Sequence, residues 1–204
     1  MGSKEISVGS FDGAVTTQEL QTFNDFAASL EPAKDNIGNN WAQGDSGEQT
    51  KAMGLIYLMA SEQPTLDQMI RFCDAVLSER NDLAPAPVGQ HTIWTGRIDP
   101  VWPNTLTSPI GTGGEQGDPV GHLASCAYLI LRIKDLYNKK VTIGDPHGYG
   151  DTYLSREKKY LAEADYSMSH QFCSPNWISP ATTKCISQRK IHTWEVNQCH
   201  GTSK

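Results

Sequence analysis

The sequence lacks any apolar run long enough to cross a membrane. No segment of the 204 residues approaches the ~18 apolar residues that a transmembrane helix needs, and the N-terminus has no apolar stretch of signal-peptide length. No Asn-x-Ser/Thr glycosylation sequon is present either. These absences predict a cytoplasmic protein with no membrane partner.

Basic residues are few and scattered. The chain has 17 Lys and Arg against 23 Asp and Glu, a formal net charge of −6, and no basic stripe. A protein that binds the phosphate backbone needs concentrated positive charge. No nucleic-acid partner is therefore expected.

Common catalytic and cofactor signatures are also missing. The glycine-rich stretch GTGGEQG lacks the Lys-Ser/Thr ending of a phosphate-binding loop and does not follow a predicted strand. Neither a G-x-S-x-G elbow nor an H-E-x-x-H zinc motif occurs. The sequence predicts no cofactor.

Cysteine is sparse and odd in number, which argues against an obligate disulfide framework. Cys73 and Cys126 fall on apolar faces of predicted helices, so we expect buried, inert thiols. The polar tail adds further metal-ligand types, namely Cys173, Cys185, His192, Cys199 and His200. Because this set contains no C-x-x-C pair, free thiols or a local disulfide are favoured over zinc, and no metal site is predicted.

Apolar residues recur with helical spacing in five segments. These are Thr17–Leu30, Ser46–Gln63, Thr65–Asn81, Asp118–Leu131 and Thr152–His170. Strand signals are confined to residues 92–94 and 141–143. We predict an all-α protein with a single helical domain over residues 1–172. An irregular tail, residues 173–204, follows and either packs on the domain or is partly disordered.

Helix starts are indicated by three local patterns. Ser46 and Thr65 each begin a capping-box sequence, with Gln49 and Gln68 three residues on. Asp118, followed by proline, is predicted to be a helix N-cap. The second and third helices are separated by so short a turn that they should form an antiparallel hairpin.

A long loop, Gln90–His122, concentrates aromatic and ionisable side chains between helices. Trp94 and Trp102 offer faces that stack on sugar rings or isoprenoid carbons, and Arg97 is suited to holding an anion. Asp99 is a candidate acid/base. The alternative is a structural pair of Arg97 with Asp99, with both indoles covering the helical hairpin.

Two further catalytic candidates are Glu115 and His122. The glycines around Glu115 leave it without an obvious structural role. His122 follows the positive end of a helix, which would lower its pKa and favour a neutral general base. A histidine bonded to the loop that precedes it is the structural alternative.

Substrate-binding candidates outside this loop are Trp41, His147 and Tyr149. The last two stand in the stretch GDPHGYG, where the glycines suit either close backbone approach to a ligand or a plain turn.

The stretch from Trp41 to about His170 resembles part of an (α/α) toroid of the six-hairpin glycosidase type. The resemblance rests on the hairpin GLIYLMASEQPTLDQMIRFCDAVLSERND and the loop IWTGRIDPVWPN. It implies stacked helical hairpins with a pocket where inter-hairpin loops converge. The chain corresponds to about half a ring, so the resemblance also implies an apolar edge that a second copy covers in a homodimer. No catalytic signature is matched residue by residue.

The leading hypothesis is an enzyme that acts on carbohydrate by hydrolysis, elimination or epimerisation, with an aromatic, carboxylate-bearing pocket. One alternative is a cyclase or isomerase of an apolar small metabolite. The other is a non-catalytic sugar-binding protein or truncated toroid relative.

Overall fold

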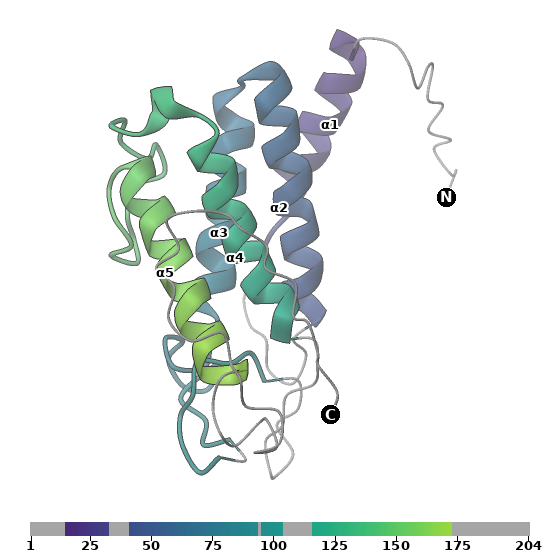
Figure 1. The fold of residues 1–204 in the computed structure, drawn as a ribbon. Coiled ribbons are helices and arrows are strands. Elements are labelled where there is room, and N and C mark those ends of the chain that lie inside the picture. The colour runs from purple at the N-terminus through teal and green to yellow at the C-terminus, as the bar shows by residue number, and fades with distance from the viewer. Residues whose placement is uncertain (1–14, 33–40, 94, 104–115, 173–204) are drawn as a thin grey trace, which may run out of the picture.

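The computed structural model describes residues 15–32, 41–93, 95–103 and 116–172, with only the backbone described at 41–45 and 171–172 (Figure 1). Its helices are α1 (Thr17–Ser29), α2 (Trp41–Ala60), α3 (Gln63–Ser78), α4 (Gly117–Leu131), the short 3-10 helix η2 (Lys134–Leu136) and α5 (Tyr153–Phe172). The described residues contain no β-strand, and Lys140 and Thr152 form an isolated bridge. The prediction of an all-α protein is confirmed: residues 92–93 and 141–143, which carried the weak strand signals, form no strand, and Trp94 lies outside the described residues.

Helices α2 to α5 run alternately up and down as a bundle, with α1 on one side (Figure 1). α4 lies centrally and packs against α2, α3 and α5, while α1 packs against α3 and α2. The antiparallel hairpin of α2 and α3 is confirmed. The core is richest along α3, where nine residues from Thr65 to Leu77 are buried. This helix therefore carries the centre of the fold.

Three predicted helix caps are wrong, because each of these residues lies inside its helix and not at the N-cap position. Ser46 lies inside α2, buried, and its carbonyl accepts a hydrogen bond from the Thr50 hydroxyl at 3.0 Å. The hydroxyl of Thr65, inside α3, donates to Asn24 of α1 at 2.8 Å. Asp118 lies within the first turn of α4, whose N-cap is Gln116.

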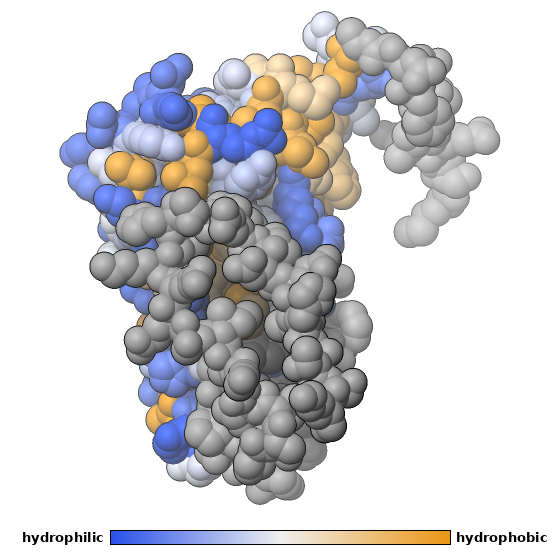
Figure 2. Space-filling model, viewed as in Figure 1, coloured by the Kyte–Doolittle hydropathy of each residue, from blue (hydrophilic) through white to orange (hydrophobic). Residues whose placement is uncertain are grey.

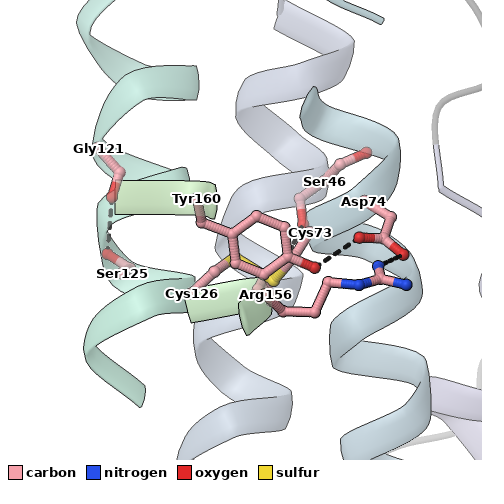
Figure 3. The surroundings of a disulfide bond; sticks show 9 residues. Ser46, Cys73, Asp74, Gly121, Ser125, Cys126, Arg156 and Tyr160 are labelled. Atoms are coloured by element: carbon pink, nitrogen blue, oxygen red, sulfur yellow. Dashed lines mark hydrogen bonds and ion pairs between the residues drawn. A yellow bond between two sulfur atoms is a disulfide. The ribbon is translucent and has the colours of Figure 1, made fainter. Parts of the chain in front are cut away.

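Cys73 and Cys126 are buried as predicted, but they form a disulfide between α3 and α4, so the prediction of two inert thiols is wrong. The packing of these helices brings the two Cα atoms to 6.2 Å, within the range that a disulfide spans. A separation of 53 residues in sequence hides this proximity. Figure 3 shows the bond beside the ring of Tyr160 from α5.

We predict that replacing both cysteines by serine lowers the free energy of unfolding by up to about 4 kcal/mol, because the bond closes a loop of 53 residues in the unfolded chain. Urea unfolding measures the change, with and without reductant. Thiol titration of the unfolded, unreduced protein should also detect no thiol from this pair. Equal stability of the two forms, or two extra titratable thiols, would contradict the prediction.

No helix in the described ranges combines the length and apolar character needed to span a bilayer. Exposed apolar side chains do occur on α2, where Leu55 and Met59 lie one turn apart. Figure 2 shows apolar colour gathered at the upper right of the face in view, near the end of α2. This is the largest apolar area visible on that face outside the grey atoms.

Candidate functional site

Trp102 is a core residue. Its indole has no exposed surface and donates to the carbonyl of Val76 at 2.9 Å. The side-chain amide of Gln116, at the start of α4, accepts from the backbone N–H of Trp102 at 2.7 Å and donates to its carbonyl. The indole therefore anchors the long loop to α3, and no face of it is open to a ligand in this structure.

Arg97 and Asp99 form the structural pair that was the alternative interpretation. Arg97 Nε lies 3.5 Å from Asp99 Oδ1, and the Thr95 hydroxyl donates to Asp99 Oδ2 at 2.6 Å. The guanidinium of Arg97 is 61% exposed. Neither residue lines the pocket described below.

His122 is buried between α4 and α2. A Cβ placed on Gly47 would come within 1.8 Å of the imidazole, so the ring fills the space that a side chain at position 47 would take. His122 does not line the pocket. Glu115 and Trp94 lie outside the described residues, as does the side chain of Trp41.

A pocket of about 240 Å³ lies between α3 and the connection that precedes α5. Its polar lining consists of Arg71, Asp74, Ser78, Glu79 and His147. Its apolar lining consists of Pro32, Ala75, Ile143 and Pro146. We name this site the Asp74 pocket. It is slightly smaller than the 300–1,000 Å³ typical of small-molecule sites, so it fits a ligand of about one sugar ring.

Asp74 is held rigidly at the wall of this pocket. Its Oδ2 accepts from Arg156 and its Oδ1 accepts from the Tyr160 hydroxyl at 2.6 Å, both from α5 (Figure 3). All three side chains are buried. Burial and the charge of Asp74 raise the pKa of Tyr160 well above its ordinary value, so its hydroxyl remains a donor. A carboxylate satisfied in this way keeps one orientation.

Arg156 also holds the opposite wall. Its Nε donates to the carbonyl of Gly150 at 2.6 Å, and its Nη2 donates to the carbonyl of Gly144 at 2.7 Å and to Asp145 Oδ1 at 3.0 Å. Gly144 has a φ of +77°, a conformation that side-chain-bearing residues rarely adopt. One guanidinium thus joins α3 to the residue 144–150 segment, which carries His147.

Asp145 organises the same segment. Its two carboxylate oxygens accept the backbone N–H groups of Tyr149 at 2.7 Å and Gly150 at 2.8 Å. Burial raises the pKa of Asp145, but these N–H groups and the Arg156 charge outweigh it and lower the pKa overall. Asp145 is therefore ionised at neutral pH.

The predicted ligand residues His147 and Tyr149 stack on each other, with ring centroids 5.2 Å apart. His147 is exposed and lines the pocket, whereas Tyr149 lies behind it near Arg156 and Lys159. Burial, followed by the charge of Asp74, raises the pKa of the Tyr149 phenol. Of the predicted site residues with described side chains, His147 is the one that lines the Asp74 pocket.

The pocket combines fixed acceptors, an imidazole and a small apolar surface. Asp74 and Glu79 have oxygens that accept hydrogen bonds, and the imidazole of His147 has two ring nitrogens that form them. Among the described residues, no group of three His, Cys, Asp or Glu side chains is placed to hold a metal ion.

Sequence reasoning missed Asp74, Glu79, Arg71 and Arg156. A signal did exist for two of them. Asp74 falls on the buried face of α3, between core residues Cys73 and Leu77, and Arg156 falls on the buried face of α5. A charged residue at a core position of a helix must have a partner, so two such residues on different helices indicate a buried pair.

No protein-family model matches this chain, and neither a curated protein nor a solved structure matches it. The resemblance to an (α/α) toroid therefore stays a prediction.

We predict that Arg156→Met lowers the free energy of unfolding by about 3–5 kcal/mol, because it leaves two carboxylates without their shared cation in a buried site. Arg97→Met is the matched control, since Arg97 pairs with a carboxylate at the surface. This substitution should change the free energy of unfolding by no more than about 0.5 kcal/mol. Urea unfolding of both variants gives the comparison. Equal costs would show that the Arg156 network does not stabilise the fold.

A second electrostatic prediction concerns Glu157, which is buried on α5. Burial raises its pKa above the ordinary 4.5. The folded state therefore binds this proton more tightly, and stability falls as the pH rises from about 4.5 through the raised pKa.

Glu157→Gln should remove that loss. We expect the variant to be more stable than the wild type at pH 7 and to show no such gain at pH 4. Thermal unfolding at the two pH values measures the difference. Glu163→Gln on the same helix is unsuitable as a control because Glu163 is half-buried and the change breaks ion pairs, so the exposed Asp165→Asn serves instead.

Proposed function

We propose that the chain binds a small carbohydrate in the Asp74 pocket. The observation that carries the proposal is the mixed lining, in which Asp74 and Glu79 share the pocket wall with Pro32, Ile143 and Pro146. Sugar hydroxyl groups donate well to carboxylates, and the C–H face of a sugar ring packs on apolar surface. The volume of about 240 Å³ suits a single ring.

A second candidate is the carbohydrate enzyme predicted from the sequence. The observation that favours it is the presence of His147 and Glu79 in one pocket, because an imidazole and a carboxyl group are the usual general acid/base pair. The residues first predicted for catalysis, Asp99 and His122, do not line this pocket. The predicted cyclase or isomerase has less support, since an apolar substrate favours a closed, mostly apolar pocket.

Titration calorimetry against a panel of monosaccharides tests the proposal. We expect millimolar or tighter binding of at least one sugar. Glu79→Gln should weaken it roughly tenfold or more through loss of a charged acceptor. Glu48→Gln is the matched control, because Glu48 is exposed on α2 and pairs with Lys51. No binding by any sugar would overturn the proposal, as would equal effects of the two variants.

The same variants separate binding from catalysis. If the chain is an enzyme, His147→Gln should abolish turnover of an aryl glycoside of the bound sugar while changing affinity by less than about tenfold. Binding without turnover in the wild type would favour the non-catalytic candidate.

Compartment and assembly are parts of the same proposal. Structural disulfides are rare in the cytosol, so the Cys73–Cys126 bond weighs against the predicted cytoplasmic location and favours an oxidising compartment.

The exposed pair Leu55 and Met59 supports the predicted homodimer, since large apolar side chains in contact with water favour association. Light scattering of the wild type beside Met59→Glu tests it.

A further inference from the structure

We propose that the Asp74 pocket selects a sugar that carries a free amino group over neutral and acidic sugars. The inference rests on the proposed function and adds the class of ligand. It follows from how charge is distributed among the side chains in and behind the pocket wall.

Two carboxylates in or behind the pocket wall, Asp74 and Asp145, share a single cation. Arg156 is the cation in contact with both Asp74 and Asp145. Among the described residues neither carboxylate has another ion pair, so this group of three carries one negative charge in excess. Asp74 and Arg156 are fully or almost fully buried, and Asp145 is 21% exposed, which limits screening of that charge by water.

The cations nearby are already balanced. Arg71, which lines the pocket, forms an ion pair with Glu31. Lys159, beside Tyr149, pairs with Glu163 at 2.6 Å. Within the described part of the chain, these cationic side chains therefore do not neutralise the excess negative charge.

Negative potential in a concave site attracts a cation and repels an anion. An ammonium group on a sugar supplies both the positive charge and three hydrogen-bond donors. Asp74 lines the pocket and cannot turn away, because Arg156 and Tyr160 hold both of its oxygens. A carboxylated sugar would meet the same group with repulsion. Elimination chemistry, which needs a uronic acid substrate, is therefore disfavoured at this site.

Four matched ligands test the inference with the wild-type protein: glucosamine, N-acetylglucosamine, glucose and glucuronate. At about pH 6 the free amine is protonated, whereas its acetylated form has no charge. We expect glucosamine to bind about tenfold more tightly than glucose or N-acetylglucosamine, and glucuronate to bind most weakly. The preference should decrease in high salt.

Asp145→Asn removes the excess charge while leaving the Asp74–Arg156 pair in place. It should bring the affinities for glucosamine and glucose to within about twofold of each other. Asp165→Asn is the control, since it changes the net charge equally at an exposed position of α5 that does not line the pocket. Should Asp145→Asn fail to fold, the order of the affinities of the wild-type protein for the four ligands still tests the inference.

Equal affinity for glucosamine and glucose, or tightest binding of glucuronate, would overturn this inference and leave the proposed function standing. Failure of all four sugars and of the wider monosaccharide panel would overturn the proposed function, and the inference with it.

Discussion

A buried guanidinium is stable only where anions and carbonyl oxygens surround it, and Arg156 meets this requirement by joining parts of the chain that are distant in sequence. Asp74 comes from α3, while Asp145 and the carbonyls of Gly144 and Gly150 come from the connection before α5. Because each donor of Arg156 needs its partner, the position of that connection is linked to the position of α3. The shape of the pocket between them therefore depends on the contacts of this one side chain.

Helix α3 is the element on which the remaining constraints meet. Cys73 and Asp74 are adjacent residues, yet one forms the covalent bond to α4 and the other the ionic contact to α5. Figure 3 shows both contacts at the same level of the bundle, with the Tyr160 ring beside the disulfide. A disulfide restricts mainly the unfolded chain, whereas the ion pair orients groups in the folded one. The two contacts therefore contribute in different ways to the same wall.

The sequence predicted the helical class and the α2–α3 hairpin because both follow from local periodicity. It failed where a side chain is used by a distant partner. Thr65 begins a capping-box sequence, but its hydroxyl bonds to Asn24 of α1. Trp102 stands in a loop rich in aromatic and charged residues, which suggested ligand stacking, but its indole fills the core. The pocket could not be found from the loop that was richest in reactive residues. Its walls are set by contacts between residues more than 80 apart, such as Arg156 with Asp74.

The same contacts bear on what chemistry the pocket can support. Each oxygen of Asp74 already accepts a hydrogen bond from a fixed donor, so protonation of Asp74 would weaken its bonds to Arg156 and Tyr160. That suits a permanent acceptor better than a general acid or base, whose pKa should lie near the working pH. In the proposed enzyme, His147 or Glu79 would supply the acid/base group, because both line the pocket outside the Arg156 network.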